Sequence, residues 1–196
     1  MKVFLCPLLV VSFLTLMEIV QSGPKCTCCR GLEGSTSAPS DFPESSSPAG
    51  GPSANPDAVV CYFYRPKNCL ICRTTNKTAK CCTAPTTETD DTKPDGPTPY
   101  NEYLIGRRYT HANHNIDWYN LYPRMENESG YYPYTTPTAT GRVTLALHPG
   151  TVSLGCVTVI KSKGRDCWPL IRGVVSCGSM TYNGDTYSGF LYVVMP

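Results

Sequence analysis

The sequence has little net charge and, beyond its first residues, no long apolar run. Its 17 Lys and Arg residues and 15 Asp and Glu residues leave a net charge of only +2. So small an excess excludes the strongly basic surface expected of a protein that reads nucleic acid. After residue 20, no apolar stretch is long enough to cross a bilayer. We therefore expect no nucleic-acid partner and no stable membrane insertion of the mature chain.

Residues 1–22 have the composition of a secretory signal peptide. Lys2 precedes a short apolar segment, and the small residue Ser22 marks the expected cleavage site. The alternative is an uncleaved membrane anchor, although the apolar run is short for a membrane span. We therefore expect a secreted, extracellular protein.

Large apolar residues are also scarce in two internal segments, residues 31–58 and residues 83–99. Both are rich in Ser, Thr, Pro or Gly and cannot bury a core, so they are predicted to be flexible linkers. Residues 23–30 form a cysteine-rich knot, and residues 59–82 hold five cysteines in a segment too short to fold without cross-links. Residues 100–196 are the part long enough for a real core.

Cysteine is abundant, with 12 residues in the chain. Removal of the signal peptide leaves 11, an odd number, so one thiol must stay outside the intramolecular bridges. Residues 23–82 carry eight, which can pair among themselves. A predicted bridge between Cys167 and Cys177 then leaves Cys156 free. This pairing requires the chain to turn back, because a straight helix between the two cysteines would hold them too far apart.

Two metal sites are possible alternatives. Cys69 and Cys72 have the spacing of a zinc knuckle, but export favours disulfides at these positions. His111 and His114 also have a spacing seen at metal sites, but two histidines on a polar loop are more often solvated.

Hydrophobic alternation predicts a mainly β domain between residues 100 and 196. The predicted strands are residues 117–123, 142–148, 156–160 and 189–194. A short helix is allowed near residues 165–178, with Asp166 as N-cap and Pro169 in its first turn. The predicted fold class is therefore a small β-sandwich or half-barrel, a sheet folded on itself with at most a short helix.

His148 and Cys156 lie eight residues apart, at the end of one predicted strand and the start of the next. A short loop between antiparallel strands would return Cys156 beside His148, and a thiol next to imidazole is readily deprotonated. Gly155 would let the backbone approach a ligand, and N–H groups near Cys156 could form an oxyanion hole. The alternative is a buried free cysteine and a histidine that caps a loop.

These residues resemble the catalytic signature of L,D-transpeptidases. The segment is most similar to the type VI secretion L,D-transpeptidase effector (Tlde) family, and the resemblance covers roughly residues 100–196. The matching residues are Trp118, Tyr119, Leu121, Tyr122, Gly141, Arg142, His148, Pro149, Ser153, Gly155, Cys156, Val157, Thr158 and Gly189. The short gap between His148 and Cys156, and Leu154 in place of a second histidine, depart from the larger bacterial subfamily.

The resemblance implies an L,D-transpeptidase-like fold and acyl transfer on peptidoglycan stem peptides. Cys156 would be the nucleophile and His148 the base and later the acid. The resemblance also implies that Ser153 orients His148 or the substrate, although a turn-forming role is an alternative. Arg142 would bind a substrate carboxylate, or else form a surface ion pair.

In the same resemblance, Trp118 and Tyr119 would contact the substrate, and no metal or other cofactor is needed. Bacterial peptidoglycan peptides would be the partners, and an antibacterial role would follow. Hydrolysis, exchange of a D-amino acid and cross-linking all remain open as outcomes. A secreted, non-catalytic protein that binds wall fragments is the main alternative. A papain-like hydrolase fits less well, because its cysteine precedes its histidine.

Overall fold

The structure, a computed structural model, describes residues 57–126, 128–161 and 166–195. The signal peptide, the cysteine-rich knot and nearly all of the first predicted linker lie outside these residues. The elements in chain order are β1 (Val59–Tyr64), η2 (Arg65–Lys67), β2 (Cys69–Arg73), β3 (Thr78–Cys82), β4 (Glu102–Ile105), β5 (Tyr109–His111), β6 (Ile116–Pro123), β7 (Ala146–Gly150), β8 (Val157–Ile160), α1 (Trp168–Val175), β9 (Met180–Tyr182), β10 (Asp185–Tyr187) and β11 (Gly189–Val194).

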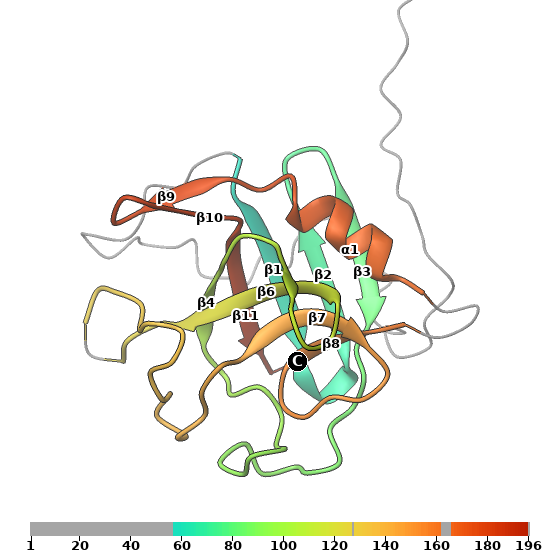
Figure 1. Cartoon of the computed structure of the whole chain (residues 1–196), viewed down its shortest axis with the longest axis vertical. Coiled ribbons are helices and arrows are strands. Elements are labelled where there is room, and N and C mark those ends of the chain that lie inside the picture. Colours follow the sequence, from blue (N-terminus) through green and yellow to red (C-terminus); the bar gives the residue numbers. More distant parts are fainter. Residues whose placement is uncertain (1–56, 127, 162–165, 196) are drawn as a thin grey trace, which may run out of the picture.

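A nine-stranded sheet runs in the order β3-β2-β1-β11-β4-β6-β7-β8, with β5 paired to β6 (Figure 1). The two ends of this order meet: Thr83, just after β3, bridges Val159 of β8, and the Ala84 N–H donates to the Thr158 carbonyl at 2.8 Å. The sheet therefore nearly closes into a barrel. This confirms the mainly β class with a sheet folded on itself.

The predicted separate module, residues 59–82, is part of the same sheet. β1 pairs in parallel with β11 along its whole length, and β2 and β3 extend the sheet beyond it. Buried side chains of β1 pack in one core with those of β11, Leu191 and Val193. Gly189 allows this pairing, because a Cβ there would lie 2.0 Å from the Val59 carbonyl oxygen. The boundary drawn before residue 100 is therefore corrected.

Disulfides hold the sheet and helix together in a pattern that differs from the prediction. Cys61 is bonded to Cys72 across neighbouring strands, and Cys81 is bonded to Cys167 before α1. Cys69 and Cys82 are also disulfide-bonded. The cysteines of the possible zinc knuckle therefore form disulfides, as export favoured. Cys177 is a free, exposed thiol, so the predicted bridge from Cys167 to Cys177 does not form.

The helix explains why that bridge is absent. α1 fills the interval between Cys167 and Cys177, and a helix of this length separates the two residues beyond disulfide reach. Trp168 donates its backbone N–H to Asp166 Oδ1 at 3.2 Å, and Pro169 lies in the first turn, where its missing N–H is not needed. The short helix is thus confirmed, although Cys167 is the N-cap residue.

One face of α1 is apolar and packs against β2 and β3. Its buried residues follow helical spacing: Trp168, Ile171, Val174 and Val175. They belong to the same core cluster as the inward-facing residues of the barrel. Within the described ranges, no helix combines the length and hydrophobicity that a membrane crossing requires.

Residues 83–99, predicted as a second linker, pack against the body of the protein instead. We call this segment the strap. Thr86 bridges Ser153, the Gly96 carbonyl accepts from Arg142 at 2.7 Å, and the Thr98 hydroxyl donates to the Gly155 carbonyl at 2.7 Å. The strap is therefore held by Arg142 and by the loop that precedes β8, and the linker prediction is corrected.

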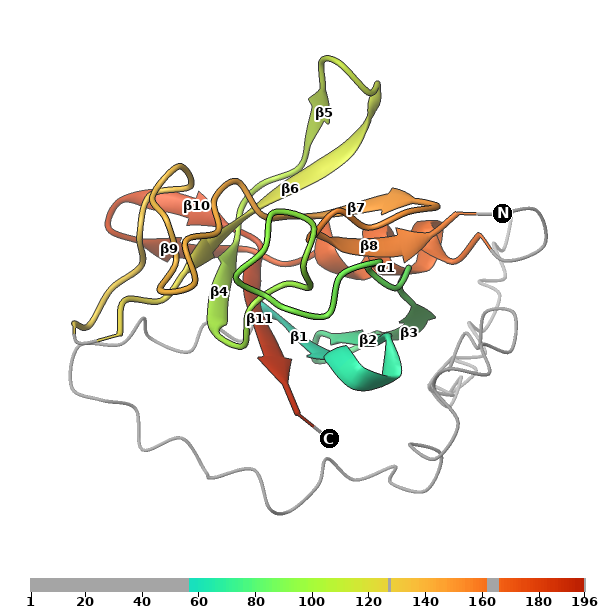
Figure 2. The ribbon, with the colours of Figure 1, turned by 90° about the horizontal axis from the view of Figure 1, so that it is seen from below.

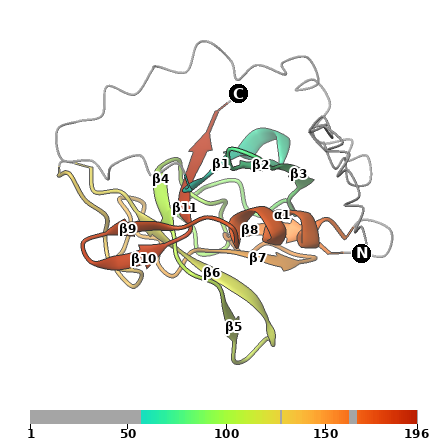
Figure 3. The same cartoon turned by 90° about the horizontal axis from the view of Figure 1, so that it is seen from above.

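The hairpin of β5 and β6 projects from the barrel, as Figures 2 and 3 show from opposite sides. β6 has eight residues, and β5 pairs with its first part beyond the region held by β4. The hairpin thus carries the residues at its tip away from the core. This arm lies next to β7, the strand that holds His148.

Candidate active site

β7 and β8 are parallel neighbours, not the antiparallel pair expected from the sequence. Leu147 lies opposite Val157 and His148 opposite Thr158. One step earlier in this register, Cys156 lies level with Ala146, whose backbone hydrogen-bonds the thiol. The short connection therefore returns the chain to the level of the start of β7, so that β8 runs in the same direction as β7.

This register places His148, Thr158 and Cys156 on one face of the sheet, because residues two apart on a strand share a face. Cys156 is the diagonal neighbour of His148, and Thr158 is its direct neighbour. Both residues therefore share a face of the sheet, but through a strand direction opposite to the one predicted.

Three contacts fix the His148 ring. Its Nδ1 lies 3.0 Å from the Pro149 carbonyl oxygen, and its Nε2 lies 3.3 Å from the Thr158 hydroxyl. The Trp118 ring stacks on the imidazole at a centroid distance of 4.4 Å with an angle of 5° between the planes. A carbonyl can only accept, so Nδ1 carries the proton of the neutral ring and Nε2 is the available base.

The surroundings keep His148 neutral. Burial lowers the pKa of the imidazole below its ordinary value, since a buried cation loses its hydration. The Pro149 carbonyl opposes this shift, whereas His114 and His111 add to it. The imidazole is therefore unprotonated, and able to take a proton, throughout the neutral pH range.

Cys156 is also held in its neutral form. The Cys156 side chain is only partly exposed, and its removal from water raises the pKa of the thiol to about 11. A backbone hydrogen bond from Ala146 and the charge of Arg142 oppose this shift, because both favour the thiolate. Although both partners are described, no hydrogen bond joins Cys156 to His148. The resting state therefore pairs a thiol with a neutral imidazole.

Ser153 shapes the loop that carries Cys156. Its hydroxyl donates to the Cys156 carbonyl at 2.7 Å and accepts the Gly155 N–H at 3.3 Å. Ser153 is buried and forms the turn, which is the alternative role named above. Because Gly155 already donates to Ser153, its N–H is not free to serve in an oxyanion hole.

Arg142 lies beneath the same loop and is buried, so it does not form the surface ion pair considered above. Its guanidinium donates to the Gly96 carbonyl at 2.7 Å and to the Leu154 carbonyl at 3.3 Å. Gly155, with φ +108°, passes so close that a Cβ there would lie 1.7 Å from Arg142 Nη2. In the structure, Arg142 therefore joins the strap to the loop that carries Cys156. Arg142 also lines the open hollow beside Cys156, and its role as a substrate clamp stays a prediction.

Trp118 and Tyr119 point to opposite faces of β6, as neighbours on a strand must. Trp118 is at the surface, against His148. Tyr119 is fully buried, packs edge-on against Trp168 and shares a 2.7 Å hydrogen bond with the Ser176 hydroxyl. Tyr119 is therefore a core residue, and its predicted contact with substrate is corrected.

Two hollows meet at Cys156. On one side an open groove of about 710 Å³ is lined by Tyr109, Trp118, Tyr134 and Leu154, and it reaches the strap. On the other side a smaller hollow of about 280 Å³ is lined by strap residues and by Arg65 and Tyr100. Cys156 thus lines both hollows.

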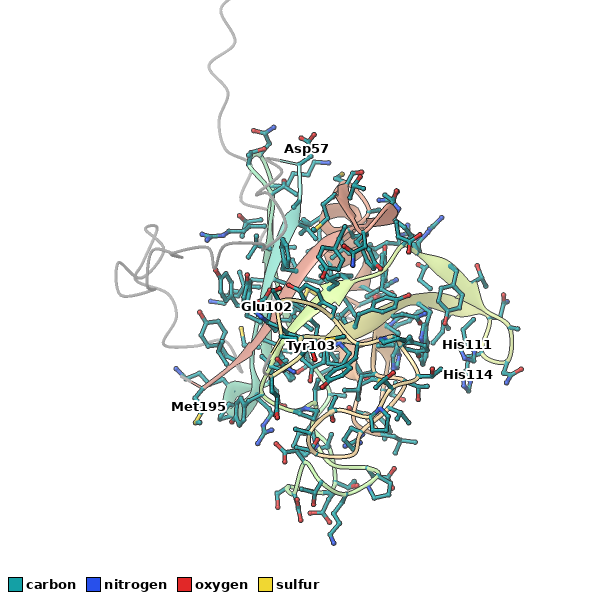
Figure 4. All side chains as sticks on the ribbon, turned by 90° about the vertical axis from the view of Figure 1, so that its left-hand side faces the viewer. Asp57, Glu102, Tyr103, His111, His114 and Met195 are labelled. Atoms are coloured by element: carbon teal, nitrogen blue, oxygen red, sulfur yellow. A yellow bond between two sulfur atoms is a disulfide. The ribbon has the colours of Figure 1, made fainter. Side chains whose placement is uncertain are left out.

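All three histidines of the chain belong to one aromatic cluster at this site. His111 and His114, which lie together at the end of the β5–β6 hairpin (Figure 4), stack at 4.7 Å, and His111 contacts Trp118 at 4.5 Å. Within the described residues, no group of three metal-binding side chains is placed to hold an ion. Sequence reasoning did not connect these histidines with His148, because their place beside Trp118 depends on the register of β5 against β6, which sets Tyr109 opposite Trp118 and His111 opposite Ile116.

Comparisons with known proteins add a limited finding. No protein-family model matches the chain, and no curated protein matches it either. Among solved structures, it is similar to the L,D-transpeptidase from Xylanimonas cellulosilytica DSM 15894, with 12% identity and a TM-score of 0.35. The match covers 73% of this chain and 63% of that chain, which is less than two thirds of its length. At this identity and TM-score, function has to be argued from the site.

Proposed function

We propose that the protein is a cysteine acyl-transferase that acts on peptidoglycan stem peptides, as an L,D-carboxypeptidase or by D-amino-acid exchange. The observation that carries the proposal is the position of Cys156 and the Nε2 base of His148 on one face of adjacent strands, at the edge of an aromatic groove. The order of the matching residues supports kinship with the Tlde family.

The reaction needs one proton transfer to begin. His148 Nε2 takes the thiol proton, and the electron pair left on sulfur attacks the carbonyl that precedes the terminal D-amino acid. The C–N bond breaks, His148 returns the proton to the leaving amine, and a thioester remains on Cys156. Water then yields the shortened peptide, or the amine of another D-amino acid yields an exchanged one.

The groove and the loop supply the positioning. Tyr109, Trp118 and Tyr134 offer flat apolar surfaces for an extended peptide beside the sulfur. Arg142 and the strap hold the loop that carries Cys156, and the Arg142 charge favours the thiolate. The fixed loop would lower the barrier to attack because a positioned nucleophile needs little reorganisation. The Arg142 charge would lower it by stabilising the thiolate.

The direct test is incubation with purified tetrapeptide muropeptides, followed by mass spectrometry of the products. We expect release of the terminal D-amino acid by the wild type and none by Cys156→Ala. Cys177→Ala is the matched control, because it removes the other free thiol of the described chain, and it should retain full activity. Equal turnover by the wild type and Cys156→Ala would contradict the proposal.

A second candidate function is non-catalytic binding of wall fragments. The raised thiol pKa and the missing contact between Cys156 and His148 favour it, since neither reactive group is charged at rest. In that case the wild type and Cys156→Ala would bind muropeptides equally well, and neither would change their mass.

We also propose that the protein is secreted and acts on bacteria outside the producing cell. The disulfides support this, because such bonds persist in oxidising compartments. Amino-terminal sequencing of exported protein should show a new terminus after Ser22. Protein that stays in the cell with an intact first segment would contradict secretion.

A further inference from the structure

A row of four side chains crosses the sheet at the site. Tyr109 on β5 lies opposite Trp118 on β6, Trp118 stacks on His148 of β7, and His148 lies opposite Thr158 on β8. Cross-strand neighbours of this kind fix one another's positions. The last member, Thr158, places its hydroxyl on Nε2, the atom that must take the thiol proton.

His148 becomes a cation when it takes that proton, and its surroundings offer little to stabilise one. His111 and His114 on the hairpin oppose the charge, and Trp118 covers one face of the ring. Within the described part of the chain, no carboxylate contacts the ring, unlike the acid-base-nucleophile triads of many hydrolases. The Pro149 carbonyl serves Nδ1, which leaves the Thr158 hydroxyl as the polar partner of Nε2.

We propose that Thr158 is a catalytic residue that holds Nε2 of His148 in both of its protonation states. The inference rests on the proposed function and deepens it. In the neutral state the hydroxyl donates to the one lone pair of Nε2. The O–H then rotates away, which frees the lone pair for the thiol proton, and the hydroxyl oxygen accepts from Nε2–H of the imidazolium. As the S–H bond of Cys156 breaks and the N–H bond forms, the electron pair stays on sulfur and the new cation keeps a hydrogen-bond acceptor.

The setting of Thr158 fits this role. The residue has 0% exposure, and its hydroxyl has no hydrogen-bond partner other than His148 among the described residues. Its backbone is fixed separately, by the β7–β8 ladder and by the N–H of Ala84. Valine has nearly the same shape and suits a strand, so Thr158→Val removes the hydroxyl with little change to packing.

The test measures the His148 imidazole pKa by NMR in the full chain, for the wild type, Thr158→Val and Thr158→Ser, with His148→Gln to assign the signal. Hydrogen bonds to charged groups are about twice as strong as those to neutral groups. Loss of the hydroxyl therefore destabilises the imidazolium more than the neutral ring. We expect Thr158→Val to lower the pKa by about one unit. Thr158→Ser, which keeps the hydroxyl, should match the wild type.

Turnover of muropeptides gives the second readout. Thr158→Val should lower the plateau rate roughly 10-fold to 100-fold and move the acid limb of the rate profile to lower pH, whereas Thr158→Ser should restore both. Thr181→Val, an exposed threonine on β9, is the matched control and should change neither measurement.

An unchanged His148 pKa in Thr158→Val, or a Thr158→Ser variant as impaired as Thr158→Val, would overturn the inference. The pKa measurement needs no turnover, so it separates the two proposals. A wild type that is inactive on muropeptides contradicts the proposed function, while a pKa shift in the same protein still supports the link between Thr158 and His148.

Discussion

At Cys156, burial and local charge act on the thiol in opposite directions. Removal from water disfavours the thiolate, whereas Arg142 and the Ala146 backbone favour it, and burial has the larger effect. A thiol in this state resists casual oxidation and alkylation, because the thiolate is the reactive form. It would become a nucleophile only when a base accepts its proton, which makes His148 essential to the proposed chemistry.

The first prediction concerns alkylation. Because the pKa of Cys156 is raised to about 11, its reaction with iodoacetamide should be slow at pH 7 and accelerate about tenfold per pH unit until that pKa. Cys177 is exposed and should react first. Time-resolved labelling with peptide mapping separates the two sites. Labelling of Cys156 at pH 7 as fast as Cys177 would show a preformed thiolate–imidazolium pair.

The second prediction compares two glycines with positive φ. Gly155→Ala should destabilise the protein by about 3 kcal/mol or more, since the new methyl group would collide with Arg142 Nη2 in addition to the backbone strain. Gly141→Ala has strain without a collision, because nothing lies within 4 Å, and should cost about 1 kcal/mol. Urea unfolding measures both, and equal losses would contradict the close packing.

At the scale of elements, local patterns predicted some pieces well and missed how they pair. β6, β8, β11 and α1 lie where alternation, β-branching and the Pro169 position indicated them. β7 starts at Ala146, later than expected: Thr144 has φ +54°, and Val143, which lies within the predicted strand, is 42% exposed. The parallel pairing of β7 and β8 was not predictable, since it depends on the neighbours of both strands and not on the connecting loop.

The strap shows why composition alone misled. Its Thr and Pro content is typical of a linker. Thr98 and Thr86 nevertheless contact Gly155 and Ser153 in the loop that carries Cys156. Thr98→Val should leave the Gly155 carbonyl without its buried donor, costing about 1–3 kcal/mol and lowering activity. Thr87→Val, at an exposed strap position, is the matched control and should change neither stability nor turnover. Equal behaviour of the two variants would mean that the strap does not support the site.

For the whole molecule, the pairing of β1 with β11 brings residues from the two ends of the described chain into one core. Sequence patterns report the faces of each strand but not a partner more than a hundred residues away. Cys156 is free as predicted, but the prediction depended on a Cys167–Cys177 bridge that does not form. The pairing of Cys81 with Cys167 needs the barrel to close before the two residues meet.

The two described bridges should differ in their contribution to stability. Cys81–Cys167 spans 86 residues and Cys61–Cys72 spans 11. Loop-closure entropy predicts about 4.5 kcal/mol for the longer loop and about 3 kcal/mol for the shorter one. Paired serine variants, Cys81→Ser with Cys167→Ser and Cys61→Ser with Cys72→Ser, can be compared by urea unfolding. A greater loss from the Cys61–Cys72 pair would contradict this order.

The last prediction tests where the folded unit begins. A fragment that starts at Tyr100 contains His148, Cys156 and the aromatic side chains of the groove, but it lacks β1, β2, β3 and the strap. Seven of the 22 buried residues of the main core cluster lie in those three strands. Without them β11 loses a neighbour, the Cys156 loop loses Thr98 and Gly96, and Cys167 loses its disulfide partner. The fragment should therefore show no cooperative thermal unfolding and no turnover, whereas the full chain should show both. Limited proteolysis of the full chain should leave residues 83–99 intact, because their backbone is hydrogen-bonded to the body. Rapid cleavage within this segment, or a cooperatively folded fragment from Tyr100, would restore the domain boundary that the sequence composition predicted.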